Sequence, residues 1–161
     1  MEDFVERYDT LDVNSRLSPT YEGDVRETKK DLREKYDCAI AADILEHIPF
    51  GDLEKALGNL HSYLKSDGRS LITIPHRAWF VFGMSWLFNY KQLIIRAPDW
   101  KRTLYHRIRG RKNNPIDLDH QWEIGDGKHS TQDVEKIMKN AGFKIEKREN
   151  LPYVDFWVLK K

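Results

Sequence analysis

Four groups of polar side chains could carry chemistry, and each follows a segment that is predicted to be a strand. Asp12 follows the first segment, and its carboxylate could accept hydrogen bonds from both hydroxyls of a ribose. Asp24 follows the second, where its carboxylate suits an exocyclic amine and a backbone N–H suits a ring nitrogen. The run from Ala42-Asp43 to Glu46-His47 follows the third segment, and His76 follows the fourth. Each acid, taken singly, could equally be a solvated or capping residue.

The expected position of these groups in the sheet strengthens the interpretation of a ligand site. In open α/β sheets, ligands bind beyond the carboxyl ends of the strands. A joint placement of the four groups at one edge of one sheet therefore favours a common ligand site over four unrelated polar residues.

The elements that must position these side chains follow an α/β pattern. Apolar runs begin the segment 36–45 and fill 70–74, and both are predicted to be buried strands of a parallel sheet. Asp52 is expected to cap the helix between them, and Gly68 is expected to end it. The apolar residues of that helix recur at helical spacing: Leu53, Ala56, Leu57, Leu60 and Leu64. Strand, helix and strand together predict a βαβ unit.

The regular pattern continues near the carboxyl terminus. Ser130 with Asp133 predicts a capping box, and Gly142 is expected to end the helix that it starts. The segments 143–147 and 154–159 are predicted to form a closing antiparallel pair of strands. Shorter strands are predicted at 8–11 and 21–25.

The composition limits the class of protein. The chain has 161 residues, 40% hydrophobic and 33% charged, with a net charge of +1, which favours one soluble domain over 1–161. Its single cysteine excludes an intramolecular disulfide. The amino-terminal sequence is acidic and lacks the apolar core of a signal peptide, and no apolar run is long enough to span a bilayer. We therefore expect a cytoplasmic protein.

A basic, aromatic block over 77–119 interrupts the pattern. It holds nine Lys or Arg against three Asp, and eight of the 19 aromatic residues. One interpretation is a lid helix over 78–90 that packs on the sheet. Another is a peripheral membrane segment whose rings enter the headgroup region beside anionic lipid. The basic run 107–112 could also contact RNA phosphates, but such runs are common on solvated surfaces, so nucleic acid is the least favoured partner.

The segment 36–76 resembles the central part of class I S-adenosylmethionine-dependent methyltransferases. The resemblance rests on a strand, a Leu-Glu-His-Ile turn, an amphipathic helix, a Leu-Lys-x-x-Gly-Arg turn and a second strand. Upstream, Leu-Asp-Val-Asn and Gly-Asp-Val resemble the family's ribose-binding and adenine-binding segments. Downstream, the helix ending in Ala-Gly-Phe and the two strands after it resemble the family's closing hairpin.

This resemblance implies a Rossmann-like α/β fold whose sheet is mostly parallel with a C-terminal antiparallel hairpin. It implies an enzyme that transfers a methyl group from S-adenosylmethionine to an oxygen or nitrogen of a small-molecule or lipid-like acceptor. The residues that it assigns to the cofactor are Asp12, Val13, Asp24, Val25, Ala42 and Asp43.

The acceptor side follows from the same resemblance together with the chemistry of histidine. Histidine titrates nearest to neutral pH, so His47 or His76 is expected to accept or orient the acceptor proton. Trp79, in the block, and His120 and Trp122, directly after it, are expected to bind the acceptor. The spacing of these histidines demands no metal, and no metal ligand is predicted.

The sequence departs from the family in one respect. The family places a glycine-rich loop after its first strand, whereas glycine first occurs here at Gly23. The strand that ends at Asp12 matches the family's second strand, so the first strand and its loop are expected to be missing. Truncation is the favoured explanation, ahead of a rearranged sheet or a chain that binds no cofactor. The alternative function is a degenerate, non-catalytic binding or membrane-associated module.

Overall fold

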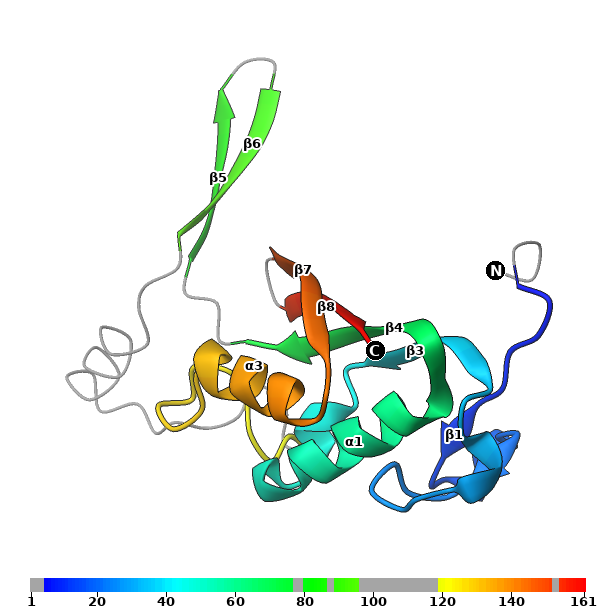
Figure 1. Cartoon of the computed structure of the whole chain (residues 1–161). Coiled ribbons are helices and arrows are strands. Elements are labelled where there is room, and N and C mark those ends of the chain that lie inside the picture. Colours follow the sequence, from blue (N-terminus) through cyan, green and yellow to red (C-terminus); the bar gives the residue numbers. More distant parts are fainter. Residues whose placement is uncertain (1–4, 77–79, 87–88, 96–118, 152–153) are drawn as a thin grey trace.

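A four-stranded mixed sheet forms the centre of the computed structural model, in the order β3-β4-β8-β7 (Figure 1). β3 (Tyr36–Ala42) runs parallel to β4 (Leu64–Pro75), while β8 (Val154–Lys160) is antiparallel to both β4 and β7 (Lys144–Asn150). This arrangement confirms the Rossmann-like sheet with a C-terminal antiparallel hairpin. The residues that the structure describes are 5–76, 80–86, 89–95, 119–151 and 154–161.

Two α-helices cover the same face of this sheet (Figure 1). α1 (Leu53–Tyr63) lies between β3 and β4 in the chain, and α3 (Thr131–Asn140) precedes β7. The other helices of the described residues are single 3-10 turns: η2 (Ser15–Leu17), η3 (Lys30–Leu32), η4 (Leu45–His47) and η5 (Phe50–Asp52). Strand, helix and strand from β3 to β4 form the predicted parallel unit.

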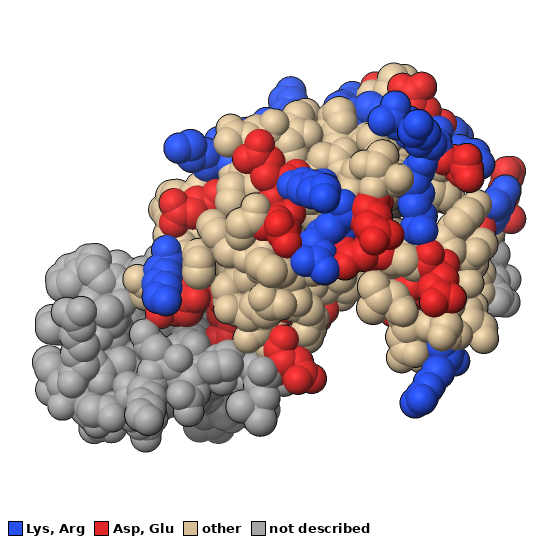
Figure 2. Space-filling model, turned by 90° about the horizontal axis from the view of Figure 1, so that it is seen from below, with Lys and Arg blue, Asp and Glu red and all other residues tan. Residues whose placement is uncertain are grey.

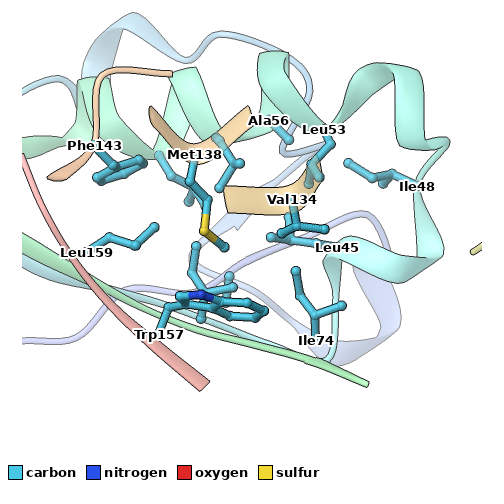
Figure 3. Close-up of a cluster of buried hydrophobic side chains, with 14 of the residues drawn as sticks. Leu45, Ile48, Leu53, Ala56, Ile74, Val134, Met138, Phe143, Trp157 and Leu159 are labelled. Carbon is cyan, nitrogen blue, oxygen red and sulfur yellow. The ribbon is translucent and has the colours of Figure 1, made fainter. Parts of the chain in front are cut away.

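The core lies between these helices and the sheet (Figure 3). Leu53 and Leu57 of α1 and Met138 of α3 are fully buried, as the helical spacing predicted for α1. From the sheet, Ile74 of β4 and Trp157 of β8 meet them. Burial of these apolar surfaces is the main term that stabilises the fold.

The helix boundaries agree with the sequence at three ends and differ at one. Asp52 precedes α1, and a reciprocal capping box starts α3, since Ser130 accepts the Asp133 N–H and Asp133 accepts the Ser130 N–H. Gly142 follows α3 with a φ of +98°, a conformation that favours glycine. Gly68 was expected to end α1, but the helix already ends at Tyr63, because Leu64 turns into an extended conformation and starts β4.

β3 was expected to be buried, and this prediction was wrong for most of its length. Ile40 is 59% exposed and Cys38 is also exposed. Within the described ranges, β3 pairs with β4 alone, whereas β1 (Leu11–Asp12) and β2 (Tyr21–Glu22) form a separate parallel pair. Both described helices cover one face of the sheet, so the alternate side chains of β3 that point to the other face, Cys38 and Ile40 among them, are exposed.

The first part of the basic block is a β-hairpin and not the lid helix that was one expectation for 78–90. β5 (Phe80–Trp86) and β6 (Asn89–Ile95) are antiparallel, with Phe80 opposite Ile95. Aromatic residues in β5 and β-branched residues in β6 favour strands, and a glycine within β5 disfavours a helix. Trp79 and the basic run 107–112 lie outside the described residues.

Candidate functional site

The carboxyl ends of β1 and β2 lie side by side and place two of the predicted groups together. Asp12 is opposite Glu22, and the Gly23 N–H donates to the Asp12 carbonyl at 2.9 Å. The Asp12 carboxylate accepts the Asn14 N–H at 2.8 Å through Oδ1, which holds the side chain at the strand end. Val13 beside it is 67% exposed. The predicted ribose and adenine segments therefore share one edge.

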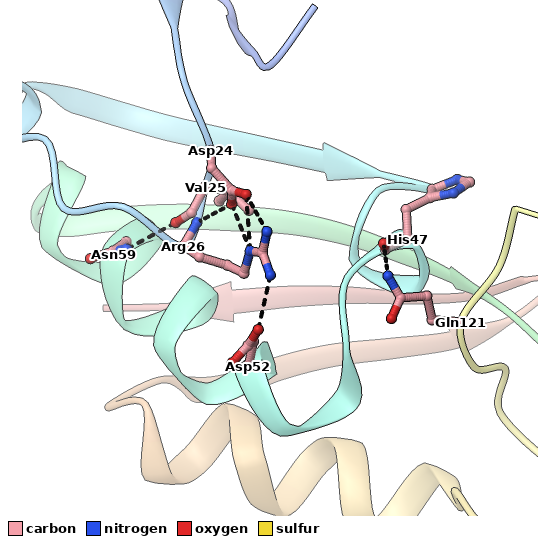
Figure 4. Close-up of polar contacts among 7 residues, drawn as sticks. All are labelled: Asp24, Val25, Arg26, His47, Asp52, Asn59 and Gln121. Carbon is pink, nitrogen blue, oxygen red and sulfur yellow. Dashed lines mark hydrogen bonds and ion pairs between the residues drawn. The ribbon is translucent and has the colours of Figure 1, made fainter.

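Asp24 is held by an arginine that also bonds to Asp52, the last residue of η5, directly before α1 (Figure 4). Arg26 Nε lies 3.0 Å from both Asp24 oxygens, and Arg26 Nη1 lies 3.0 Å from Asp52 Oδ2. The Arg26 guanidinium lowers the pKa of Asp24 below its ordinary value. Asn59 donates to the Val25 carbonyl at 2.9 Å, so the backbone of this segment is fixed to α1.

The Asp24–Arg26 pair predicts a pH dependence of stability. Because the folded pKa of Asp24 is depressed, the pair stabilises the fold above about pH 4 and loses its effect as pH falls through the folded pKa. We expect Arg26→Gln to lower Tm at neutral pH and to have a smaller effect at acid pH. Thermal unfolding of the two proteins, followed by circular dichroism across roughly pH 2 to 8, where carboxylates titrate, measures the Tm difference at neutral and at acid pH. A Tm difference that is equal at every pH would contradict this account.

The end of β3 places Ala42 and Asp43 beside β4. Ala42 is opposite Thr73, and the Thr73 hydroxyl donates to Asp43 Oδ1 at 2.8 Å. Asp43 has a φ of +52°, so the chain turns sharply after β3. His76 is 2% exposed, and its Nε2 lies 2.9 Å from the Leu151 carbonyl. A ring held in this way suits a positioning role better than contact with an acceptor.

The structure brings two of the predicted histidines, His47 and His120, together. Their ring centroids are 4.9 Å apart in an edge-to-face arrangement. His47 is exposed, with Nδ1 3.2 Å from the Asp119 carbonyl oxygen. Gln121 donates from its backbone to the Glu46 carbonyl and from its side chain to the His47 carbonyl, each at 2.9 Å (Figure 4). The segment after the basic block therefore returns to η4, the turn that follows β3.

The remaining aromatic site residue has a packing role in the structure. Trp122 is 3% exposed, donates from Nε1 to the Ile48 carbonyl at 3.0 Å and packs edge-to-face on Phe50. Trp79 lies outside the described residues.

Two carboxylates of the site region, Glu46 and Glu123, were given no role by the sequence, although Glu46 belongs to the third polar group. Both are fully buried beside the histidine pair. The sequence feature that could have indicated them is their closeness to the histidines, since Glu46 directly precedes His47 and Glu123 lies three residues after His120. Acidic residues are mostly exposed, so burial of either was not expected.

Comparison with known proteins gives the family. A family model described as "Methyltransferase domain" matches residues 3–148. No match was found among curated proteins.

Several of the similar solved structures are methyltransferases by their descriptions, all at low sequence identity. Burkholderia thailandensis 1,6-didemethyltoxoflavin-N1-methyltransferase, with bound S-adenosylhomocysteine, has a TM-score of 0.55 at 12% identity, covering 94% of this chain and 59% of that one. An S-adenosylmethionine-dependent methyltransferase from Mesorhizobium loti has a TM-score of 0.56 at 13% identity, covering 94% and 78%. Synechocystis magnesium protoporphyrin IX methyltransferase, also with S-adenosylhomocysteine, has a TM-score of 0.50 at 19% identity, covering 89% and 51%.

At these identities the solved structures show the fold. This chain spans 59% of the length of the first of them. The family model, in contrast, matches most of the sequence, including the ends of β1 to β4 where the predicted groups lie. The chain belongs to the methyltransferase domain family.

Proposed function

We propose that this protein is an S-adenosylmethionine-dependent methyltransferase that acts on an oxygen or nitrogen of a small-molecule acceptor. The observation that carries the proposal is the adjacency of the ends of β1 and β2, which places Asp12 beside the Gly23–Val25 segment. Two of the similar structures are described as holding S-adenosylhomocysteine, the product form of this cofactor.

The residues present fit the nucleoside half of the cofactor. Asp12 uses Oδ1 for its own turn, and within the described part of the chain no hydrogen bond involves Oδ2, so that oxygen is available to a ribose hydroxyl. The backbone from Gly23 to Val25 is held in place through Asn59 and Arg26 and can present an N–H to a purine ring. Ala42 and Asp43 at the end of β3 are proposed to complete the cofactor site.

The cofactor supplies an activated methyl group and its own leaving group. The task of the protein is therefore positioning, which contributes a large part of the barrier reduction when two reactants are held in line. Asp12 fixes the ribose, and the exposed His47 ring is proposed to accept or orient the acceptor proton. His120, against His47, is proposed to line the acceptor side, and His76 to hold the end of β4 in position through Leu151.

A small molecule is proposed as the favoured class of acceptor. Two of the similar structures are enzymes named for acceptors of that class, a toxoflavin precursor and a porphyrin. Figure 2 shows Lys or Arg interspersed with Asp or Glu over the face that it presents, and not a field of one sign. Among the described residues, no helix has the length and apolarity to cross a membrane. A lipid-like acceptor with membrane contact through 77–119 remains the wider proposal.

A non-catalytic binding module is the second candidate. The observation that favours it is the uncovered strand β3, where Ile40 is 59% exposed. A domain of this kind could bind a nucleoside at the ends of β1 and β2 and transfer nothing.

Calorimetric titration with S-adenosylmethionine tests the proposal. We expect saturable binding with one cofactor for each chain. No binding at millimolar cofactor would contradict both the enzyme and the nucleoside-binding module. If binding occurs, incubation with methyl-labelled cofactor and a panel of small phenols, amines and carboxylic acids separates the two candidates, since only the enzyme transfers label.

A further inference from the structure

Glu46 is a buried carboxylate without a hydrogen-bond donor. Its side chain is fully buried, and within the described ranges neither oxygen has a hydrogen-bond partner. Burial of an unpaired ionised carboxylate is costly, and protonation would only replace an unpaired charge by an unpaired O–H group. Glu46 Oε1 lies 3.8 Å from His120 Nε2, which is too far for a hydrogen bond.

The two histidines beside Glu46 are oriented by groups that can only accept hydrogen bonds. His120 Nδ1 lies 3.0 Å from Glu123 Oε1, and His47 Nδ1 lies 3.2 Å from the Asp119 carbonyl oxygen. Each Nδ1 is therefore assigned the proton, which leaves an unshared electron pair on each Nε2. A histidine that donates Nδ1–H to a carboxylate or a backbone carbonyl is the arrangement found at metal-binding histidines.

The backbone holds these three residues in place before any ligand binds. Glu46 and His47 are consecutive in η4, and both of their carbonyls accept hydrogen bonds from Gln121, the residue next to His120. Figure 4 shows one of these two bonds, from the Gln121 side chain to the His47 carbonyl, which joins η4 to the segment after the basic block. The two halves of the cluster cannot separate without breaking both bonds.

We propose that Glu46, His47 and His120 bind a divalent transition-metal cation such as Zn²⁺ or Co²⁺. One ligand atom from each residue lies within 4.8 Å of the others. In a tetrahedral site with metal–ligand distances of about 2.0–2.2 Å, two ligand atoms are roughly 3.3–3.6 Å apart, so small movements, mainly of the exposed His47, complete the site. The 3.8 Å between Glu46 and His120 is close to this separation.

The ligand set also indicates the class of cation. Two imidazoles with one carboxylate favour Zn²⁺ and its neighbours over Mg²⁺, which prefers oxygen ligands and retained water. Three protein ligands leave a coordination position open to water or to an oxygen of a bound molecule, as in zinc sites that act on ligands. The proposal rests on this cluster and not on the proposed cofactor site, but it shares His47 and His120 with the proposed acceptor side. A His47 Nε2 that binds a cation cannot also accept a proton, so with metal bound His47 would act as a ligand and not as the proton acceptor.

Titration of the metal-free protein with Co²⁺ at neutral pH, without S-adenosylmethionine, tests the site. Visible absorption and calorimetry should show one Co²⁺ for each chain. Glu46→Gln and His47→Gln should each weaken binding by at least tenfold. Glu123→Gln keeps an acceptor oxygen for His120 but removes the charge, and should weaken binding by up to about tenfold, in the range found for outer-shell partners. The control His61→Gln, a histidine of α1 that packs on Phe143, should leave the affinity unchanged.

Two results would overturn the proposal: no binding of Co²⁺ to the unaltered protein, or an unchanged affinity in His47→Gln. His47 is exposed, so this variant should fold, which circular dichroism checks. If the buried Glu46→Gln does not fold, His47→Gln decides the question alone. A rise in Tm with Zn²⁺ that is present in the unaltered protein and absent in His47→Gln gives a second, independent readout.

Discussion

Asp12→Ala is expected to lower the affinity for S-adenosylmethionine by at least tenfold while the protein remains folded. Hydrogen bonds to a charged group contribute about 1.5–3 kcal/mol each, and a carboxylate that holds two ribose hydroxyls loses both on truncation. Within the fold, the Asp12 side chain accepts one hydrogen bond, from the Asn14 N–H next to it. The affinity should therefore change much more than Tm. Calorimetry of the variant measures the first and thermal unfolding the second.

Glu22→Ala is the matched control for this prediction. Glu22 is an exposed carboxylate opposite Asp12 on the neighbouring strand, so its removal changes the local charge by the same amount. We expect its affinity to stay near that of the unaltered protein. Equal losses in the two variants would indicate a general charge effect, and an unchanged affinity in Asp12→Ala would leave Asp12 as a turn residue only.

Trp157→Ala should cause a large loss of stability, because it empties the centre of the core. The Trp157 ring is fully buried in β8, which pairs with β4 and with β7, and it meets Met138 from α3 (Figure 3). Removal of a buried tryptophan side chain costs about 3–5 kcal/mol in the free energy of unfolding. For a chain of this size this corresponds to a fall in Tm of roughly 6–20 °C. Chemical and thermal unfolding measure the two quantities.

Trp157→Phe separates packing from the polar contact of the ring. Trp157 Nε1 donates to Glu135 Oε1 at 3.2 Å, and phenylalanine removes this bond but keeps much of the apolar volume. We expect a loss clearly smaller than that of Trp157→Ala. If both variants lose the same stability, the effect belongs to the hydrogen bond and the packing account is contradicted.

The sequence predicts the helices and the sheet well because their signals are local. Helical spacing in α1 and the Ser130–Asp133 capping box in α3 lie within a few residues of the elements that they define. The exposure of Ile40 in β3 has no local signal. The side chains on one face of a strand are buried only if another element covers that face, and the described helices cover the face to which Ala41 points, not the one to which Ile40 points.

The features of the candidate site also divide into those that the sequence predicts and those that depend on tertiary structure. The placement of Asp12 next to Gly23 and Asp24 follows from the rule that parallel strands end at one edge. The meeting of His47 with His120 depends on how the chain returns after the basic block, which the sequence indicates only by resemblance. The burial of Glu46 was not predictable, because a Glu-His pair in a turn is commonly exposed and only the tertiary structure places Gln121 and His120 over it.

The most direct test of the proposed function is a map of where S-adenosylhomocysteine binds. In a titration of the ¹⁵N-labelled protein followed by NMR, we predict the largest amide shifts at Asp12–Asn14 and at Gly23–Val25, the segments at the adjacent ends of β1 and β2. Smaller shifts should reach Ala42 and Asp43, and the amides of β7 should not move. Saturable shifts that leave the ends of β1 and β2 untouched, or no shifts at millimolar ligand, would contradict the proposal that these strand ends bind the cofactor.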